Sequence, residues 1–541
     1  MVIIFFIFFI LTGIANSSVA GQNDVDFTSS NLPIIKIDTQ GNTIENDERI
    51  VAAMEIIWND NNERNYLTDP SNNYNGRIEI EYHGQSSLMF PKKSYRIETQ
   101  DSFGENRNES LLGMPEENDW ILYAPYSDKT LMRNVLAYKL AAEISDYAPR
   151  TKYCELVLND EYRGVYVLTE RIKRDKNRIN ITKMLPDDIE EPAVCGGYIF
   201  KIDKMDAGDN IIKLTSGLRL VIIEPKKDVI ADGQTSWLKN HLNDFEDELY
   251  SSGNYASFID VNSFVENLII VELAKNIDGY RLSTYFNKDR DGKIIATPVW
   301  DYNLSFGNAD YFYGWTPEGW YYSNLTTWDH NWWPELLKDP TFNSLSAGRW
   351  AELRTNQLTK SHIFSLIDEW TILLQEAQQR NFIKYPVLGE YVWPNPGFPQ
   401  SGSYGSNSPT SGGPVTYEEE ITYMKDFIEQ RVEWLDQQFG FAAGLQTDFT
   451  KQNMMFTLYQ NSPNPFNAST KITYSISNSG TVTLMIFDLL GRNIQTLVNE
   501  FQEAGSYQIN FDAGQLTSGI YFYRLYTGNK FSEIKKMILI R

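Results

Sequence analysis

The chain has 541 residues, of which 42% are hydrophobic, and its 71 acidic residues against 48 basic ones give a net charge of −23. A chain this apolar can bury a core, which excludes a wholly disordered protein, a collagen-like repeat and a coiled coil. A surface this negative repels phosphate backbones, so nucleic acid is excluded as a general partner. The length suits about three or four domains, or one large domain with accessories.

The N-terminal segment, residues 1–20, predicts a signal peptide. Residues 2–14 are largely apolar and Ser18-Val19-Ala20 resembles a cleavage site, whereas a membrane-spanning helix needs about 20 apolar residues. We expect the mature chain to start near Gly21. No Lys or Arg precedes the apolar run, so an uncleaved anchor is the alternative. No later stretch approaches spanning length, so we expect no transmembrane segment in the mature chain.

The middle of the chain predicts one large α+β domain, from about residue 30 to 440. Apolar–polar alternation predicts strands at 34–38 and 78–82 and a hairpin over 154–168 that turns at Asn159-Asp160. Apolar residues at helical spacing predict helices over 128–141 with Asp128 as N-cap, over 261–274 and over 418–439. The polar stretch 393–414 is expected to be an exposed loop.

The two cysteines, Cys154 and Cys195, are too few for a disulfide scaffold or a four-cysteine zinc site. They are compatible with one disulfide or with two buried free thiols. The four histidines have no ligand spacing, which argues against zinc.

A turn rich in glycine and serine follows the strand at 78–82 and is a candidate phosphate site. Gly84, Ser86 and Ser87 can offer backbone N–H groups and hydroxyls to an anion, and Lys93 can reach the same phosphate as a point charge. By strand alternation Lys93 is expected to face the covered side, and Lys92 to point the other way. A plain turn with solvated lysines is the alternative.

Glu170 ends the second strand of the predicted hairpin. A carboxylate there can orient Lys93, as a glutamate orients the nucleotide-binding lysine of protein kinases. The alternative is an ordinary charge on an edge strand.

Asp278 and Asp301 are candidates for metal-assisted phosphoryl transfer. A predicted hairpin, 284–286 and 294–297, separates them and can bring both to one cleft. One carboxylate together with the Asn303 oxygen can hold Mg²⁺, which takes hard oxygen ligands. The other carboxylate can position an attacking hydroxyl and accept its proton. Solvated acidic residues at turns are the alternative.

Two features after residue 310 complete the inventory. Residues 311–333 are rich in aromatic side chains, which can stack on sugar rings or on an adenine, or pack as a lid over a cleft.

Short alternating runs at 471–476, 481–487 and 520–525, separated by turn residues, predict a small all-β, Ig-like sandwich.

Two family resemblances emerge from these motifs. The first is carried by motifs in family order: Pro91-Lys92-Lys93-Ser94-Tyr95, Leu112-Gly113-Met114-Pro115, Arg133-Asn134, Tyr162-Arg163-Gly164-Val165-Tyr166, Gly196-Gly197-Tyr198, Asp278 and Trp300-Asp301-Tyr302-Asn303. This set resembles the CotH spore-coat kinase family over about residues 75–440. The resemblance implies a divergent, atypical protein-kinase-like fold that uses ATP and Mg²⁺.

Carried over by position, the resemblance implies roles for individual residues. Asp278 matches the catalytic aspartate and Asp301 the metal-binding aspartate. Lys93 matches the nucleotide-phosphate lysine, with Glu170 as its partner. The sequence departs from the family pattern at His83, where arginine is common, and at Asn303, where a second aspartate is frequent.

The second resemblance concerns the C-terminus. Tyr459 to Asn467 (YQNSPNPFN), residues 488–492 (DLLGR), residues 519–524 (GIYFYR) and Lys535-Lys536 resemble a type IX secretion sorting domain. The resemblance implies export through the periplasm and outer membrane, and contact with the type IX machinery. A retained structural module is the alternative.

The expected organisation is therefore a signal peptide (1–20), a kinase-like domain (21–440), a linker (441–455) and the sorting domain (456–541). The leading hypothesis is a secreted or surface kinase that phosphorylates Ser/Thr hydroxyls of extracytoplasmic proteins. A catalytically inactive surface binding or adhesion protein on the same fold is the first alternative, and a glycan-active surface enzyme with paired carboxylates is the second.

Overall fold

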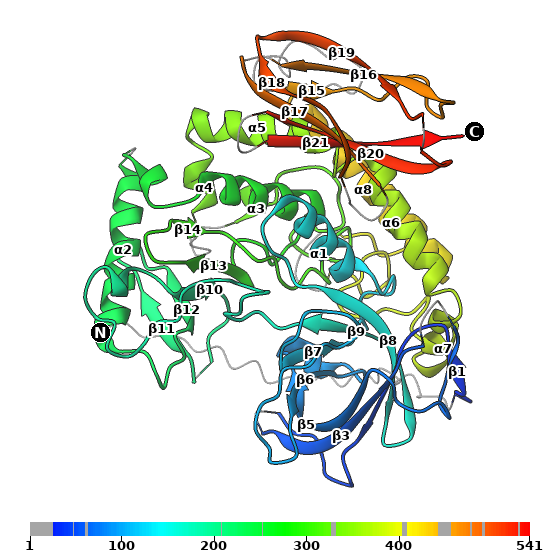
Figure 1. Ribbon diagram of the computed structural model, residues 1–541. Helices are drawn as coiled ribbons and strands as arrows, with labels where there is room; N and C mark the ends of the chain where they lie inside the picture. Colours follow the sequence, from blue (N-terminus) through cyan, green and yellow to red (C-terminus); the bar gives the residue numbers. More distant parts are fainter. Residues whose placement is uncertain are drawn as a thin grey trace. The chain divides into compact units, whose positions relative to one another are not determined.

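The computed structural model describes residues 25–46, 48–59, 63–206, 208–251, 253–325, 332–402, 408–441, 456–476, 479–488, 493–514, 516–527 and 531–540 (Figure 1). Contacts divide the chain into two units, residues 1–441 and 442–541, which are described separately below. The predicted signal peptide lies outside the described residues, as does the predicted linker apart from its first residue.

A closed barrel of seven strands forms the first half of unit one, drawn in blue to cyan in Figure 1. The strands follow the order β2-β3-β5-β6-β7-β9-β8, and the parallel pairing of β2 with β8 closes the barrel. Their bounds are β2 (Ile34–Asp38), β3 (Ile50–Ile57), β5 (Tyr74–His83), β6 (Ser94–Gln100), β7 (Asp119–Tyr123), β8 (Thr151–Leu158) and β9 (Glu161–Glu170).

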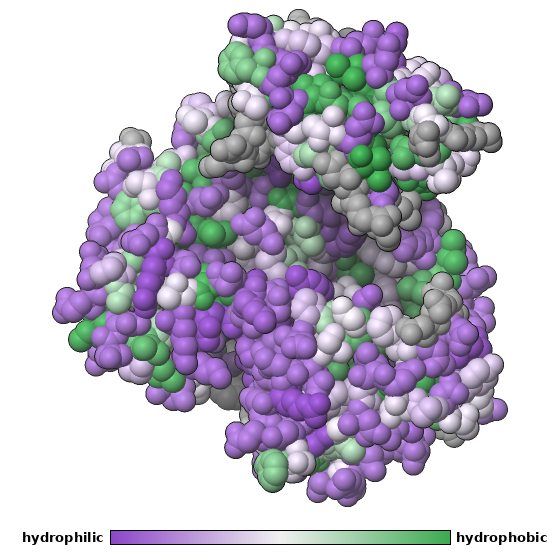
Figure 2. All heavy atoms as spheres, viewed as in Figure 1, coloured by the Kyte–Doolittle hydropathy of each residue, from purple (hydrophilic) through white to green (hydrophobic). Residues whose placement is uncertain are grey.

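Alternating side chains fill the interior of this barrel, as the two-residue period of a strand requires. The interior residues include Ile37, Ile56, Ile80, Ile97, Trp120, Leu122 and Leu168, all buried. Ion pairs cover part of the outside, among them Arg49 with Glu79 and Arg171 with Asp119. Figure 2 accordingly shows mainly hydrophilic residues over the visible face of the barrel.

The second half of unit one consists of a five-stranded sheet and α-helices. The sheet order is β11-β12-β10-β13-β14, with bounds β10 (Tyr198–Ile202), β11 (Asn210–Lys213), β12 (Arg219–Glu224), β13 (Thr284–Lys288) and β14 (Ile294–Ile295). The helices are α1 (Arg133–Ile144), α2 (Asp232–Tyr250), α3 (Val261–Ala274), α4 (Trp333–Leu336), α5 (Pro340–Arg354), α6 (Lys360–Leu373), α7 (Ala377–Lys384) and α8 (Tyr417–Gln438). Short elements complete the unit: β1 (Ser29–Ser30), β4 (Asn65–Tyr66), η1 (Ser86–Met89), η2 (Ala193–Cys195), η3 (Tyr255–Ser257) and η4 (Tyr322–Asn324).

Most of the predicted elements are confirmed. α3 occupies the predicted residues, α8 agrees to within one residue at each end, and β8 and β9 form the predicted hairpin around Asn159. The helix predicted from residue 128 begins instead at Arg133, because Leu131 adopts a left-handed φ of 64° that a helix cannot contain. Asp128 is therefore not the N-cap, although its Oδ2 accepts a hydrogen bond from the Arg133 N–H at 2.8 Å.

The prediction of an exposed loop at 393–414 is confirmed only in part, since residues 399, 400 and 409–412 are exposed and other described residues of the loop are not. The segment is irregular, but Asn395 and Phe398 are buried. The Asn395 side chain donates to the Ser127 carbonyl at 2.9 Å and to Asn308 Oδ1 at 2.8 Å. These two bonds pair the buried amide nitrogen of Asn395 and the Ser127 carbonyl, as buried polar groups require.

Unit two is all-β. One sheet contains β15 (Phe456–Leu458), β16 (Ser469–Ile476) and β19 (Gly505–Asp512). The other has the order β18-β17-β20-β21, with β17 (Gly480–Phe487), β18 (Asn493–Gln502), β20 (Gly519–Thr527) and β21 (Phe531–Leu539). The three predicted strands lie in β16, β17 and β20, and the alternating residues Ile472, Leu484 and Tyr523 are buried in its core.

Two smaller predictions concern the cysteines and the membrane. Cys154, which is buried, and Cys195, which is half-buried, are both free thiols. Among the described residues no helix combines the length and the hydrophobicity that crossing a membrane requires.

Candidate functional site

Asp278 and Asp301 lie at the ends of segments that flank the strand pair β13–β14. Asp278 follows α3 by a short turn, and Asp301 lies within the loop after β14. Burial, reinforced by the charges of Asp278 and Asp203, raises the pKa of Asp301 to about 7. Burial also raises the pKa of Asp278, with Asp203 adding to the effect and Arg281 and Lys204 opposing it. The two carboxylates are thus close enough to repel each other.

Helix α1 holds the loop that carries Asp301. The Asp301 N–H donates to the Tyr138 hydroxyl at 3.0 Å, and the Tyr302 N–H donates to Asn134 Oδ1 at 2.6 Å. Arg133 donates to the carbonyl oxygen of Ser305 at 3.1 Å. These bonds stabilise a backbone in which Asp301 has a left-handed φ of 62°, a conformation that costs free energy for a residue with a Cβ.

Asp278 is fixed by an ion pair within its own turn. Arg281 donates to Asp278 Oδ1 at 2.8 Å, and the Asp278 side chain is 14% exposed. The Arg281 guanidinium lies 4.9 Å from the centre of the Phe312 ring. The carboxylate is therefore oriented and partly desolvated, as a positioned general base must be.

The glycine/serine turn reaches this site through the loop that follows β10. Lys204 donates to Ser86 Oγ at 2.9 Å, and Gln85 Nε2 donates to both carboxylate oxygens of Asp206 at 2.7 and 2.8 Å. The positive charge of Lys204 also opposes the rise in the pKa values of Asp278 and Asp301. The turn, Lys204 and the two acidic residues therefore lie in one region.

Gly84 is needed for the shape of this turn. Its φ is 104°, and a Cβ at this position would lie 2.1 Å from Ser87 Oγ. Any other residue would be strained and would displace the serine. The turn continues as the short helix η1, which contains both Ser86 and Ser87.

The expectation that Lys93, and not Lys92, is the covered lysine is wrong. Lys92 is the buried one, 2% exposed, and it donates to the Val165 carbonyl at 2.5 Å and to Asn381 Oδ1 at 2.8 Å. Lys93 is half-buried, and its ammonium group donates to the Leu88 carbonyl of η1. Lys92 is covered because α7 packs against the outer face of the barrel here, so the side opposite the barrel interior is not solvent.

The predicted pairing of Glu170 with Lys93 is also wrong. Glu170 is fully buried and accepts hydrogen bonds from Arg150 Nη1 at 2.8 Å and from the Tyr147 hydroxyl at 3.2 Å. In strand register it lies opposite Trp120 of β7, whereas the Tyr166 hydroxyl reaches the Lys93 carbonyl at 2.9 Å. Four residues of strand, about 13 Å, separate these two levels of the barrel wall.

Three charged residues of the site were missed by sequence reasoning: Lys201, Asp203 and Lys204. Lys201 pairs with Asp203 at 2.7 Å, and Asp203 Oδ1 accepts the Lys204 N–H at 2.8 Å. A strand followed by alternating charges is typical of a solvated turn, so the local pattern carries no signal for this role.

The two departures from the family pattern have different surroundings. Burial, with the charges of Arg171, Arg96 and Lys201, lowers the pKa of His83 to about 4. His83 is therefore neutral near pH 7 and offers no charge to a phosphate. Asn303 is half-buried in the loop after Asp301, and its carbonyl accepts a hydrogen bond from Asn308 at 2.8 Å.

The chemistry of the acidic pair fits a hard cation with few protein ligands. Among the described residues no three or more Cys, His, Asp or Glu side chains are grouped closely enough to hold a metal ion. Mg²⁺ needs less, because it is usually held by one or two carboxylates, substrate phosphates and water. Two half-buried carboxylates, one of which raises the pKa of the other, are a donor set that such a cation would stabilise.

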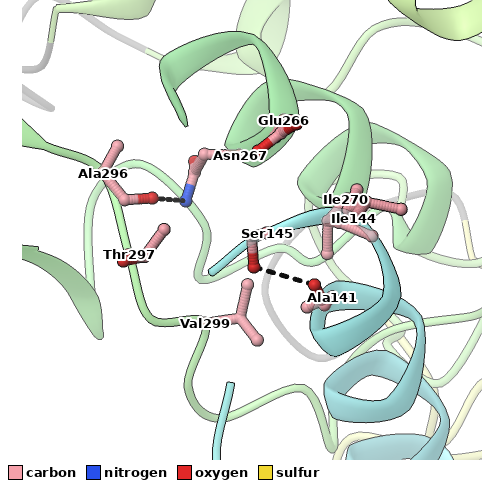
Figure 3. A pocket seen from close by; sticks show the side chains of 9 residues that line it. All are labelled: Ala141, Ile144, Ser145, Glu266, Asn267, Ile270, Ala296, Thr297 and Val299. Carbon is pink, nitrogen blue, oxygen red and sulfur yellow. Dashed lines mark hydrogen bonds between the residues drawn. The ribbon is translucent and has the colours of Figure 1, made fainter. Parts of the chain in front are cut away.

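A small pocket lies behind this loop, between α1, α3 and residues 296–299 (Figure 3). Its lining is mainly apolar, and within it Asn267 Nδ2 donates to the Ala296 carbonyl at 3.4 Å. None of its lining residues is a predicted site residue.

The aromatic segment contributes mainly to the core. Trp332 and Trp333 are fully buried and pack against Phe264, with ring centroids 6.3 and 5.2 Å away. Trp320 packs edge-on against Trp434 at 5.1 Å. Trp328 lies outside the described residues. Trp320, Trp332 and Trp333 therefore favour packing over a sugar-binding platform.

Comparison with known proteins assigns both units. A family model described as CotH kinase protein matches residues 80–435, and one described as secretion system C-terminal sorting domain matches residues 462–540. The sorting domain indicates export to the cell surface or secretion. No curated protein matches the chain.

Proposed function

The chain belongs to the CotH kinase protein family, and from this premise we propose that it is an exported, Mg²⁺-dependent protein kinase that transfers the γ-phosphoryl group of ATP to Ser/Thr hydroxyls of extracytoplasmic proteins. The observation that carries the proposal is the meeting of Asp278 and Asp301 with Lys204 and the glycine/serine turn. A cation, a turn and paired carboxylates are the parts that phosphoryl transfer requires.

In this proposal Asp278 positions the acceptor hydroxyl. Its Oδ1 is held by Arg281, and Oδ2 accepts the hydroxyl proton as the oxygen attacks the γ-phosphorus. The bond between the γ-phosphorus and the β,γ-bridging oxygen breaks, and ADP leaves with that oxygen. Burial raises the pKa of Asp278, which makes it a stronger proton acceptor than a solvated aspartate.

Asp301 and Asn303 would hold the metal. When bound, Mg²⁺ supplies positive charge that neutralises the phosphate oxygens. The contribution of the chain is to fix Asp301 through α1 and to keep the carboxylate partly dry. Gly84, Ser86 and Ser87 offer backbone N–H groups and hydroxyls to the phosphates.

The test is transfer of label from γ-labelled ATP, with Mg²⁺, to the chain itself and to dephosphorylated casein. Asp278→Asn is expected to reduce incorporation at least about a hundredfold, as loss of a general base does, and Asp301→Asn is expected to reduce it as well. The matched control is Asp228→Asn, an exposed aspartate beyond β12. Equal incorporation by wild type and Asp278→Asn would exclude the proposed chemistry.

One observation favours a second candidate, an inactive surface binding protein on the same fold. His83 is neutral and the Lys93 ammonium is bound to a backbone carbonyl, so two groups expected at the phosphates do not offer them a charge. If the protein is such an inactive binding protein, ATP with Mg²⁺ should not raise its thermal unfolding temperature. If it is a kinase, ATP and Mg²⁺ together should raise that temperature more than the sum of their separate effects, because metal and nucleotide share one site.

A further inference from the structure

Lys204 stands out among the cations of the site by its partner. Lys201 is paired with Asp203 at 2.7 Å, and Arg281 with Asp278 at 2.8 Å. Lys204 instead donates to a neutral hydroxyl, Ser86 Oγ, at 2.9 Å, and its residue is exposed. A cation held by a hydroxyl gains more from an arriving anion than a cation that already has a carboxylate, because charge-assisted hydrogen bonds are the stronger ones.

The backbone around Lys204 is fixed relative to the glycine/serine turn. Asp203 Oδ1 accepts the Lys204 N–H at 2.8 Å, and Asp206 receives both hydrogen bonds from Gln85. The loop of residues 203–206 is therefore joined to the turn at two points. The ammonium group lies beside a turn whose serines and N–H groups suit an anion.

Lys204 is also within electrostatic reach of both acidic residues. Its positive charge opposes the rise that burial causes in the pKa values of Asp278 and Asp301. The Lys93 ammonium, by contrast, is bound to the Leu88 carbonyl and so stabilises the end of η1. Lys93 thus supports the turn from within its own chain segment.

We propose that Lys204, and not Lys93, is the residue that binds the phosphates of the nucleoside triphosphate. This inference rests on the proposed kinase function. An anion that binds between the turn and the carboxylates would replace the Ser86 hydroxyl as the hydrogen-bond partner of the Lys204 ammonium. The Gln85–Asp206 contact would keep the loop in place. Lys93 is then a positioning residue for the turn.

The experiment measures ATP affinity with Mg²⁺ by calorimetry, adenosine affinity by competition, and KM and kcat for ATP. Lys204→Ala is expected to weaken ATP binding about ten- to a hundredfold, the usual effect of losing a hydrogen bond to a charged group, with adenosine affinity unchanged. Lys204→Arg is expected to restore most of the affinity. The exposed control Lys226→Ala is expected to remain within about threefold of wild type. Lys93→Ala, which removes a support of the turn, is expected to weaken ATP binding less than Lys204→Ala does.

The outcomes distinguish a failure of the Lys204 assignment from a failure of the proposed kinase function. If wild type transfers phosphate but Lys204→Ala binds ATP normally, or if Lys93→Ala suffers the loss instead, the assignment of Lys204 is overturned and the kinase proposal stands. An equal loss for adenosine also overturns it, because Lys204 would then act on the shape of the site. Wild type that binds neither ATP nor adenosine overturns both. Thermal unfolding of each variant verifies that it folds.

Discussion

Arg133 offers the sharpest test of how the Asp301 loop is held. Its side chain is fully buried and donates to Asp128 Oδ1 at 2.7 Å and to the Ser305 carbonyl at 3.1 Å. Arg133→Met keeps the volume and removes the donors. Loss of one partner from a buried ion pair costs about 3–5 kcal/mol. Asp128 still accepts hydrogen bonds from the Thr130 hydroxyl at 2.6 Å and from the backbone N–H of residue 133 at 2.8 Å. We therefore expect Arg133→Met to lower the free energy of unfolding by about 3 kcal/mol, the low end of this range.

Urea unfolding followed by tryptophan fluorescence measures this change, because all 13 tryptophans precede residue 442 and report on unit one alone. The double variant Arg133→Met with Asp128→Asn no longer buries an unpaired carboxylate. Its loss of unfolding free energy should therefore be at least about 1 kcal/mol smaller than the sum of the losses of the two single variants. Arg133→Met should also weaken binding of ATP with Mg²⁺, since the loop loses a tether. A loss below about 1 kcal/mol with unchanged nucleotide binding would refute the reasoning.

Three further predictions use the same unfolding assay. Burial lowers the pKa of Lys92 to about 7, so above pH 7 the unfolded chain binds the extra proton and stability rises with pH, by up to about 1.4 kcal/mol per unit. Lys92→Met should therefore have a larger stability advantage over wild type at pH 6 than at pH 9; a pH-independent difference would contradict it. Glu170→Gln should destabilise unit one by weakening the Arg150 contact yet leave ATP affinity unchanged, and a selective loss of ATP affinity would restore its predicted role. Gly307→Ala should cost about 1–3 kcal/mol, because Gly307 has a φ of 85° and a Cβ would lie 2.9 Å from the Phe427 ring; unchanged stability would show that the loop can relax.

Local patterns were sufficient for the elements whose stability is local. The apolar run of α3 and the tight turn between β8 and β9 were both predictable, since helical spacing and turn residues are visible within about 15 residues. The β13–β14 hairpin was predictable in the same way. It follows that Asp278 and Asp301 could be expected near each other, because a hairpin returns the chain to where it began.

Contacts between distant segments were not predictable in this way. Closure of the barrel depends on the parallel pairing of β2 with β8, over a hundred residues apart. Lys92 is buried because Asn381 of α7 accepts its hydrogen bond, and no pattern near residue 92 indicates that a helix from residue 377 onward covers it. Alternation shows which side chains share a face, but not what lies against that face.

The same limit applies to the charges of the site. A motif can nominate Lys93 because it follows a glycine/serine turn, but whether its ammonium is available depends on the nearest acceptor, and that acceptor is the Leu88 carbonyl. Lys204 comes from a different sheet, and its importance follows from a bond to Ser86, 118 residues away. Coulomb energy depends on distance in space and on burial. Which cation binds an anion is therefore decided by the fold, which brings one loop close to the site, and not by nearness in the sequence.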